Sequence, residues 1–447
     1  MRFSRQSEIL VLGVSLVAAG CQSESLDQVA KPAGPAEWVL ESKGRVAIQI
    51  DDEPEWVERA SDLPPRPYQI TAITWEPAEE DNQRRTRHDP LVNDVSLSIV
   101  SGLADLQSLN LHGKPISDAG LVHLASLPQL AELILRQTNV QSAGLAHLKK
   151  LSRLTQLDLF DTLLDDDGLA QLANLTTLRQ LDVGQTRITD AGLKQIARLT
   201  RLEQLSLRGT KITDDGLAAL VDLENLRRLD LSGIPITDTG LAHLGRLVRL
   251  EELNLDHSKV ARELAPLGNL TRLTTLRLSR TEVNDQGVGA LAGLTELRTL
   301  CLDGTGITDA GIASLSRLSK LEHLAIGENN IGDGALEQLG RLQELRFLNL
   351  HLTGVSDAGM PRLATLPELE ELNLVGAAGV TDDGIAELAG LKQMQRLYLG
   401  NTGLTDAGLQ HLDGMAKLSI IRVDRTRVTP EGVEALQQKL PQLKILW

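Results

Sequence analysis

The chain is 447 residues long, only 2% of its residues are aromatic, and its formal net charge is −15. The acidic balance disfavours nucleic acid as a partner, because neutralising phosphates requires a basic face. With so few aromatic rings the core must be built from aliphatic side chains. A basic or weakly charged protein remains open as a partner.

Residues 1–21 have the pattern of a secretion signal. A basic start precedes an apolar run over residues 9–19 that is too short to span a bilayer comfortably. The run ends in Leu16-Val-Ala-Ala-Gly-Cys21, which resembles the lipobox of bacterial lipoproteins. The resemblance implies a lipid such as palmitate on Cys21 and a place in the bacterial cell envelope, and Gln22 favours the outer membrane. An ordinary secretory signal and an unlipidated Cys21 are the alternatives.

The residues that follow divide into a tether and a cap. Residues 22–36 are polar and rich in Pro and Gly, which predicts a flexible tether. Residues 37–102 are expected to form a small N-terminal α+β cap. A short helix is predicted over residues 35–43, strands over 45–50 and 69–75, and an acidic, Pro-rich loop over 53–67.

Four aromatic residues lie in this cap, namely Trp38, Trp56, Tyr68 and Trp75. The first layer of a stack of repeats must be covered by a terminal unit, so we expect these rings to seal the N-terminal end rather than to bind a ligand. Residues 92–100 have the apolar spacing of a degenerate repeat whose strand would lie near 70–75. Residues 76–90 are then a charged insertion, predicted to be a solvated loop, with a docking segment as the alternative.

From residue 103 to residue 439 a phrase of about 24 residues recurs fourteen times. The copy at 175–198, LTTLRQLDVGQTRITDAGLKQIAR, has apolar residues at positions 1, 4, 7, 9, 14, 19 and 22, Thr at 12, Thr-Asp at 15 and 16, and Gly at 18. Such fixed self-similarity predicts a solenoid. The seventh copy, 247–269, is one residue shorter and lacks the TDxG segment. Residues 440–447 begin a further strand and are expected to form a C-terminal cap with Trp447 as its lid.

Each repeat combines a strand with a helix. Positions 4 to 10 alternate as a strand whose residues 7 and 9 point inward, and strands one repeat apart should pair in parallel. From position 16 the apolar spacing becomes helical, and Thr189 or Asp190 is expected to be the N-cap of its copy. The Thr at position 12 is expected to bond neighbouring backbone at the turn, with Asn329 in its place in the tenth repeat.

The pattern LxxLxxLxLxxT/N with a trailing GLxxL resembles the leucine-rich repeat proteins. It is most similar to bacterial members and to the ribonuclease-inhibitor-like and cysteine-containing subclasses. The resemblance implies an α/β solenoid, with a curved parallel sheet on the concave face and short helices on the convex face.

The sequence contains none of the common catalytic or phosphate-binding motifs, so no enzyme activity and no cofactor are predicted. Cys301, His323 and His351 lie on nearby strands. A metal site needs convergent side chains, whereas these stand on strands roughly 5 to 10 Å apart, so no metal is predicted. If Cys21 carries lipid, Cys301 has no disulfide partner.

The resemblance implies that the concave face is the functional surface, formed by positions 6, 8 and 10. All three aromatic residues of the repeats other than Trp447 fall on these positions, and aromatic residues and Arg are enriched at binding hot spots. The candidate partner-binding residues are Asp158, Phe160, Asp182, Arg228, Asp230, Asp256, Asp303, Phe347, Asn349, His351, Arg396 and Tyr398.

The sequence therefore predicts a membrane-anchored scaffold that binds a protein or peptide on its concave face. The alternative is a structural or self-associating envelope protein without a discrete ligand. The identity of the partner and the oligomeric state are left open.

Overall fold

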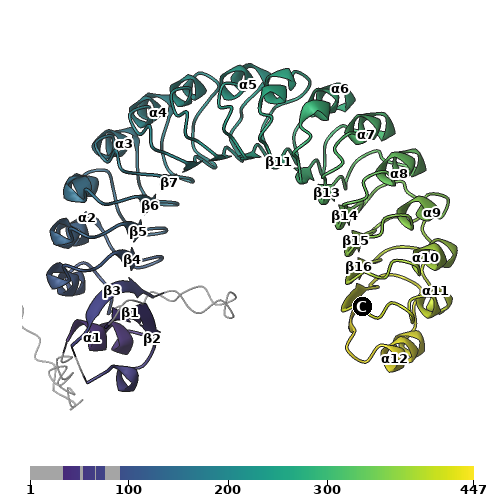
Figure 1. Ribbon diagram of the computed structural model, residues 1–447, viewed down its shortest axis with the longest axis horizontal. Helices are drawn as coiled ribbons and strands as arrows, with labels where there is room; N and C mark the ends of the chain where they lie inside the picture. Colours follow the sequence, from purple (N-terminus) through teal and green to yellow (C-terminus); the bar gives the residue numbers. More distant parts are fainter. Residues whose placement is uncertain (1–33, 51–53, 66, 76–90) are drawn as a thin grey trace, which may run out of the picture.

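The computed structural model describes residues 34–50, 54–65, 67–75 and 91–447. The signal predicted for residues 1–21, with Cys21, lies outside the described residues, as do nearly all of the tether at 22–36 and the insertion at 76–90. The described chain forms an open arc in which strands line the inner side and helices the outer side (Figure 1). This confirms the predicted solenoid.

One sheet runs through the whole arc. Its order is β2-β1-β3 and then β4 to β18 in sequence, and it is parallel from β3 onward. Equal positions of neighbouring repeats pair, as Leu181 does with Leu205. The repeat strands are β4 (Ser108–Asn110), β5 (Glu132–Ile134), β6 (Gln156–Asp158), β7 (Gln180–Asp182), β8 (Gln204–Ser206), β9 (Arg228–Asp230), β10 (Glu252–Asn254), β11 (Thr275–Arg277), β12 (Thr299–Cys301), β13 (His323–Ala325), β14 (Phe347–Asn349), β15 (Glu371–Asn373), β16 (Arg396–Tyr398), β17 (Ile420–Arg422) and β18 (Lys444–Leu446).

These strands cover only positions 6 to 8, although the sequence alternates over positions 4 to 10. Backbone hydrogen bonds between repeats nevertheless continue past the strand ends. The Asp161 N–H donates to the Gly184 carbonyl at 2.9 Å, and the Arg179 N–H to the Thr155 carbonyl at 2.8 Å. The sheet hydrogen bonding is thus longer than the strands themselves.

Short helices form the convex layer. Several close as 3-10 turns, which is common for runs of one or two turns. The α-helices of the repeats are α2 (Asp118–Leu121), α3 (Asp166–Leu172), α4 (Asp190–Ile196), α5 (Asp238–Leu244), α6 (Asp285–Gly289), α7 (Asp309–Leu315), α8 (Asp333–Leu339), α9 (Met360–Leu363), α10 (Asp382–Leu388), α11 (Asp406–Gln410) and α12 (Pro430–Lys439). The 3-10 helices there are η3 (Ser96–Gly102), η4 (Val122–Ser126), η5 (Gly144–Lys150), η6 (Gly216–Leu220), η7 (Ala265–Asn269) and η8 (Ala290–Gly293). No helix in the described part of the chain is long and apolar enough to cross a membrane.

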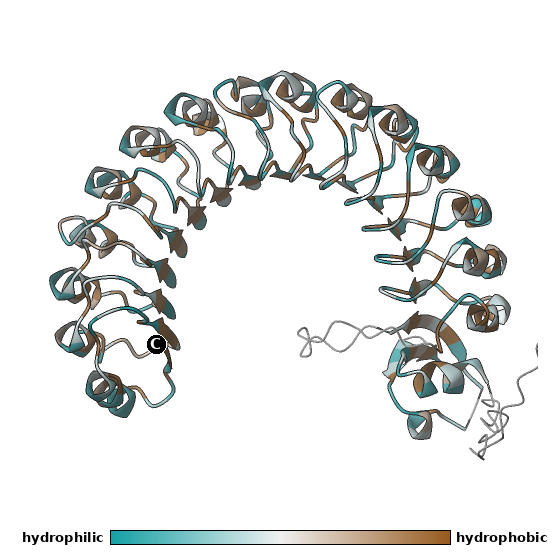
Figure 2. Ribbon diagram, turned by 180° about the vertical axis from the view of Figure 1, so that it is seen from behind, coloured by the Kyte–Doolittle hydropathy of each residue, from teal (hydrophilic) through white to brown (hydrophobic). Residues whose placement is uncertain are grey.

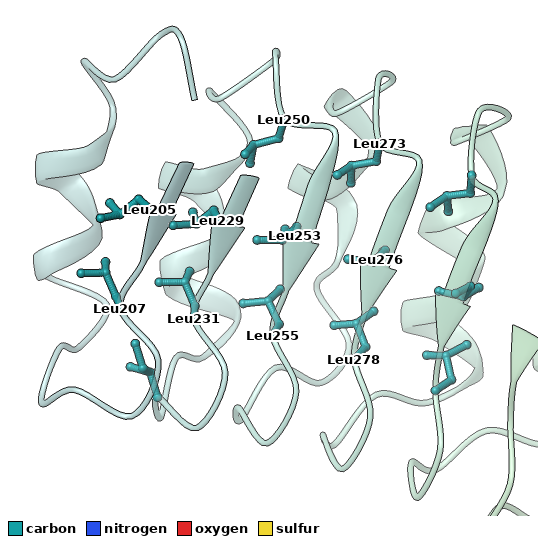
Figure 3. Packing of buried hydrophobic residues seen from close by; sticks show 14 of the residues in the cluster. Leu205, Leu207, Leu229, Leu231, Leu250, Leu253, Leu255, Leu273, Leu276 and Leu278 are labelled. Carbon is teal, nitrogen blue, oxygen red and sulfur yellow. The ribbon is translucent and has the colours of Figure 1, made fainter. Parts of the chain in front are cut away.

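The core is a set of leucine columns between the two layers. Position 7 supplies Leu205, Leu229, Leu253 and Leu276, and position 9 supplies the column of Leu207, Leu231, Leu255 and Leu278 (Figure 3). All of these side chains are at most 2% exposed. Burial of one such side chain stabilises the fold by about 1.5–3 kcal/mol. The helices carry both hydrophobic and hydrophilic residues, as expected with one face on this core (Figure 2).

The N-terminal cap consists of α1 (Pro35–Glu41), β1 (Arg45–Gln49), β2 (Pro54–Val57), η1 (Ala60–Asp62) and β3 (Gln69–Thr74). Strand β3 pairs in parallel with β4, which confirms that the degenerate repeat has its strand there. The loop predicted for 53–67 is wrong in part, because β2 forms within it. An edge strand tolerates a Pro at its first residue, and β2 is such an edge.

Two of the aromatic residues in the cap seal the end of the solenoid as predicted. Trp75 is 5% exposed and meets Trp38 edge to face, with ring centroids 5.7 Å apart. Tyr68 packs partly against the same core. Trp56, in contrast, is 48% exposed and lies under the Arg45 guanidinium at 5.2 Å, so it does not seal the end.

The predicted lid at the C-terminal end is also wrong. Trp447 is 65% exposed, and Leu446 beside it is exposed as well. Leu443 and α12 cover the last layer instead, through buried Leu436. The apolar character of Trp447 did not by itself indicate whether another residue would pack against it.

The recurrent Thr and Asp have different tasks. Thr189 is the N-cap of α4, and its hydroxyl accepts from the Ala191 N–H at 3.3 Å. The Asp at position 16 instead reaches the next repeat: the Asp166 carboxylate accepts from the Thr189 N–H at 2.8 Å and from its hydroxyl at 2.7 Å. The same pair of bonds joins Asp190 to Thr213. Of the two candidates, Thr189 is therefore the cap, and the Asp ties repeats together.

The Thr column at position 12 confirms the prediction. Each of its hydroxyls donates to the carbonyl three residues earlier, and these residues are Thr138, Thr162, Thr186, Thr210, Thr281, Thr305, Thr353, Thr402 and Thr426. In the tenth repeat Asn329 takes the place of Thr. Its side-chain amide donates three hydrogen bonds, to the carbonyls of Leu302, Ile326 and Gly327.

Candidate functional site: the concave face

Positions 6 and 8 lie on the side of the sheet opposite the core. The middle residue of each strand from β4 to β17 is buried while the residues on either side are partly exposed in most copies, for example in β7. The candidate residues at positions 6 and 8 therefore lie on the concave side of the sheet, and those at position 10 follow two residues after the strand ends. Asp256 is an exception to their accessibility, because it is only 8% exposed. Its carboxylate accepts from Arg277 Nε at 2.8 Å and from the Ser279 N–H at 2.7 Å.

Position 8 is Asp or Asn in many copies for a structural reason. In these repeats the side-chain oxygen accepts from the backbone N–H two residues later, which closes a turn at the end of the strand. The acceptors with this bond are Asn110, Asp158, Asp182, Asp230, Asn254, Asn349 and Asn373, at 2.8–3.2 Å. An amide oxygen and a carboxylate oxygen can both accept this hydrogen bond. Where the residue is Asp, its second carboxylate oxygen remains for other contacts.

The N-terminal arm carries an ionic cluster around Arg136. Arg136 Nε and Nη2 contact the Oδ2 atoms of Asp158 and Asp182, each at 2.9 Å. The same guanidinium lies 4.2 Å from the centroid of the Phe160 ring. Arg136, at position 10 of the second repeat, was not among the predicted site residues. Phe160 is half-buried beside this guanidinium.

Electrostatics set Asp182 apart within this cluster. Burial raises the pKa of the Asp182 carboxyl above its ordinary value, and the neighbouring Asp158 carboxylate raises it further. Hydrogen bonds from Gly184 and Ser206 and the charge of Arg136 act in the opposite direction and do not cancel the rise.

A shallow hollow of about 350 Å³ lies between β6 and β11. Gln156, Gln180 and Gln204 line it side by side at position 6 of three adjacent strands. Their side-chain amides make no hydrogen bond to the described residues, so each offers a donor and an acceptor to the solvent. Charged groups flank this row, among them Asp230 and Arg228, which pairs with Glu252 at 3.1 Å. The row of three amides emerges only when the repeats are aligned on the sheet.

The C-terminal arm carries the other two aromatic residues. Phe347 stacks on His323, with ring centroids 5.8 Å apart, and is half-buried. Tyr398 lies two strands away on β16, where burial and then the Glu371 carboxylate raise the pKa of its hydroxyl. Glu371 also accepts from Arg396 Nε. Phe160 follows β6 on the opposite arm, so the fold does not gather the aromatic residues in one cluster (Figure 1).

His351 and Asp303 are joined through Asn349. His351 Nδ1 lies 3.1 Å from Asn349 Oδ1 and its Nε2 lies 3.0 Å from Glu328 Oε1. Asn349 Nδ2 donates to Asp303 Oδ1 at 3.1 Å. These bonds hold the three polar side chains in fixed positions on the concave face.

Cys301 lies on β12 in the middle of the face. Burial raises the pKa of its thiol to about 11, so the thiol is protonated at neutral pH. Among the residues that the structure describes, no group of three His, Cys, Asp or Glu side chains could hold a metal ion.

Sequence comparison identifies the family. Residues 213–447 match the leucine-rich repeat region family, and residues 176–236 match a second leucine-rich repeat family. The first match covers more than half of the chain, and the chain therefore belongs to the leucine-rich repeat family. Proteins of this family generally mediate protein–protein interaction. Comparison with curated proteins finds no significant match.

Solved bacterial proteins share the fold. An internalin from Listeria monocytogenes is 27% identical over 62% of this chain and 82% of its own, with a TM-score of 0.51. A leucine-rich repeat protein from Leptospira interrogans is 21% identical over 78% of this chain and 91% of its own, with a TM-score of 0.58. At this identity the second likeness concerns the fold alone.

Proposed function

We propose that this protein is a membrane-anchored recognition scaffold that binds a protein or peptide on its concave face. The observation that carries the proposal is the row of unpaired amides of Gln156, Gln180 and Gln204 in the hollow between β6 and β11. Buried at an interface, such groups need hydrogen-bonding partners, and a polypeptide backbone offers both donors and acceptors. The arrangement suits a polar partner rather than an apolar one.

Both arms of the arc offer additional contacts to a partner held in the opening. The Arg136–Phe160 pair lies on one arm, and Phe347 and Tyr398 lie on the other. Partly exposed rings with fixed neighbours add contact area at a small entropic cost. A partner that fills the opening would touch both arms, whereas a short peptide would occupy the hollow alone.

The anchor and the address are part of the proposal. The segment Leu16-Val-Ala-Ala-Gly-Cys21 supports lipidation of Cys21 and a place in the bacterial cell envelope, with the outer membrane favoured by Gln22. The 24-residue period with helices on the convex face supports a repeat subclass similar to the ribonuclease-inhibitor-like one. The proposal assigns no catalysis to the chain.

Site-specific photocrosslinking in living cells tests the binding face. A photoreactive residue placed at Gln180 or Gln204 should give a discrete adduct with a partner, and one at Phe347 should give an adduct if the partner fills the opening. The matched controls are Gln171 and Gln410, exposed amides on the convex helices α3 and α11. Equal adducts from both faces, or none from the hollow, would rule out the concave site.

Metabolic labelling tests the anchor separately. Labelled palmitate should enter the wild type and be lost from Cys21→Ala. Label retained in the variant, or absent from both, would exclude lipidation while leaving the binding face untouched.

A further inference from the structure

Charge is segregated between the two flanks of the arc. All repeat strands run the same way, so they begin on one flank and end on the other. In Figure 3 the chain passes from Leu250 near the first flank to Leu255 near the second. We call the flank where β6 to β11 begin the basic flank, and it comprises the loops that lead from each helix into these strands, within residues 149–274.

Two rows of cations lie on the basic flank. Position 3 of four repeats supplies Arg153, Arg201, Arg249 and Arg272, and the residues just before three of these repeats supply Lys149, Lys150, Arg198 and Arg246. All eight side chains are exposed. Their only hydrogen bond or ion pair to the described residues is from Arg249 to the Asn225 amide at 2.8 Å.

Acidic residues on this flank are fewer and mostly committed. Glu203 and Glu251 each pair with an arginine of the preceding repeat, Arg179 and Arg227, in an alternating ladder along position 5. Asp222 and Glu224 are the remaining acids of the flank. The eight cations of the two rows therefore remain without a carboxylate partner.

Stacking and helix dipoles do not account for the cations at position 3. A cation at the C-terminal end of a helix is favourable, and this can explain Lys149, Lys150, Arg198 and Arg246. The row at position 3 lies beyond the helices. The position 5 ladder already supplies the ion pairs between repeats.

A second hollow, of about 380 Å³, opens on this flank near the starts of β4 to β8. Arg153, Arg179 and Arg201 line it together with the side chains of Gln107, Gln129 and Thr177. No carboxylate lines it. Arg179 keeps its pair with Glu203, while Arg153 and Arg201 present guanidinium donors to whatever enters the hollow. Phosphate is a group that arginine binds well in this way.

The opposite flank is acidic. The third repeat by itself contributes four acidic residues to it, and the fifth contributes two more. These are Asp161, Asp165, Asp166 and Asp167, and Asp214 and Asp215. The net charge of −15 thus hides a basic side on a protein that is acidic as a whole. A surface with such an excess of one sign attracts a target of opposite charge.

We propose that the basic flank docks on the surface of an anionic lipid bilayer, with lipid phosphates entering the hollow lined by Arg153, Arg179 and Arg201. The cations occupy equal positions in successive repeats, on the same flank of the arc whose outline Figure 1 shows from the side of its shortest axis. They are therefore spread over a plane, which fits a flat anionic surface better than a small ligand. Docked in this way the arc lies on its side on the bilayer. The opening of the concave face then points along the membrane surface and stays accessible. The proposal requires neither the lipid on Cys21 nor a partner on the concave face.

Vesicle partitioning of the full-length protein tests the proposal. The measured quantity is the ratio of binding to vesicles of phosphatidylglycerol and phosphatidylcholine over binding to pure phosphatidylcholine. We expect the wild type to prefer the anionic vesicles, less so in 200 mM than in 50 mM salt, because screening weakens surface charges. The variant Arg153→Gln/Arg201→Gln/Arg249→Gln/Arg272→Gln should lower the ratio by at least about tenfold, since each cation near such a surface contributes about 1 kcal/mol.

The control variant removes four exposed cations from the opposite flank, Arg187→Gln/Lys211→Gln/Lys259→Gln/Arg427→Gln. It changes the net charge equally and should keep the ratio within about twofold of the wild type. All three proteins share the same N-terminal residues, so an anchor contributes equally to each. An equal loss in both variants, no preference of the wild type for anionic vesicles, or binding to soluble polyphosphate without binding to vesicles would overturn the proposal.

Discussion

At the scale of single residues, the columns that make the repeats conspicuous are internal hydrogen-bonding devices. The Thr186 hydroxyl is buried and donates to the Val183 carbonyl at 2.6 Å. Ser258 occupies the same column in the seventh repeat, but its buried Oγ has no partner among the described residues. One column therefore contains both a satisfied and an unsatisfied hydroxyl.

This difference predicts opposite outcomes for two similar substitutions. Thr186→Ala should lower the free energy of unfolding by about 1 kcal/mol, the typical worth of a buried hydrogen bond. Ser258→Ala should leave it unchanged or raise it, because an unsatisfied buried hydroxyl is costly. Urea titration followed by circular dichroism measures both. A loss at Ser258 as large as that at Thr186 would show that Ser258 is bonded in solution.

The raised pKa of Asp182 predicts a pH-dependent effect. A carboxyl whose pKa is higher in the folded than in the unfolded state binds more protons when folded, so its contribution to stability falls as the pH rises through its ordinary pKa. Asp182→Asn keeps the acceptor for the Gly184 N–H and leaves Arg136 paired with Asp158. We expect the variant to be more stable than the wild type at pH 7. The difference should vanish below about pH 3, where the Asp182 carboxyl is protonated and neutral like the amide that replaces it. Thermal melts over this range that favour the wild type at pH 7 would contradict this.

At the scale of elements, neighbouring repeats are joined by a fit between Asp at position 16 and Gly at position 18 of the next copy. The Asp166 carboxylate lies so close to Gly192 that a Cβ there would come within 2.3 Å of Asp166 Oδ1. Gly at position 18 is therefore set by the close approach of a carboxylate from the previous repeat. Nothing comparable surrounds Gly293, which has no heavy atom within 4 Å of an added Cβ.

Two glycine substitutions separate this fit from general helix propensity. Gly192→Ala should destabilise the protein by about 1–3 kcal/mol, because the added methyl group overpacks the contact with Asp166. Gly293→Ala should be neutral or slightly stabilising, since Ala restricts the unfolded chain. The free energies of unfolding of the two variants distinguish the fit with Asp166 from general helix propensity. Equal effects of the two substitutions would refute the fit.

Much of the fold could be predicted from spacing within one repeat, because the inward leucines, the Thr column and the parallel sheet depend on local alternation. The task of Asp166 could not, since its partner Thr189 is 23 residues away and the contact depends on how the helices stack. Of the site, the concave positions were predictable, but the turn-closing role of Asp182 and the contact of Arg136 with Phe160 were not. Both depend on the conformations of polar side chains, which a pattern of apolar residues leaves undefined.

At the scale of the whole molecule, the seventh repeat is the shortest copy in the stack. Residues 247–269 contain only the 3-10 helix η7, as the second and fifth copies contain only η5 and η6, but the seventh copy also lacks the TDxG segment. The Asp238 carboxylate compensates in part by accepting from the N–H groups of Ala261, Arg262 and Glu263 at 2.7–3.1 Å. Burial acts to raise the pKa of Asp238, but these bonds outweigh it and hold the pKa below its ordinary value.

Because repeats contact only their neighbours, a weak copy should open before the rest. We expect backbone amides of residues 247–269 to exchange with deuterium faster than those of repeats three and ten. Asp238→Ala should accelerate exchange at Ala261, Arg262 and Glu263 in particular. Asp383→Ala, which removes an exposed carboxylate without a hydrogen bond to the described residues, is the control. Uniform exchange along the arc would argue against a weak seventh repeat.

The contact between Asp166 and Thr189 makes each regular repeat a unit with one carboxylate that projects forward and one threonine and glycine that receive the carboxylate behind. A whole copy inserted between two such units would form, with each neighbour, the same carboxylate and threonine contacts that the two units had formed with each other. Duplication of a repeat therefore requires no new chemistry at either junction, and the gene can lengthen or shorten the arc in steps of one unit. The second and seventh copies, which have Gln141-Ser142 and Ala261-Arg262 at positions 15 and 16, are the places where this exchange would fail.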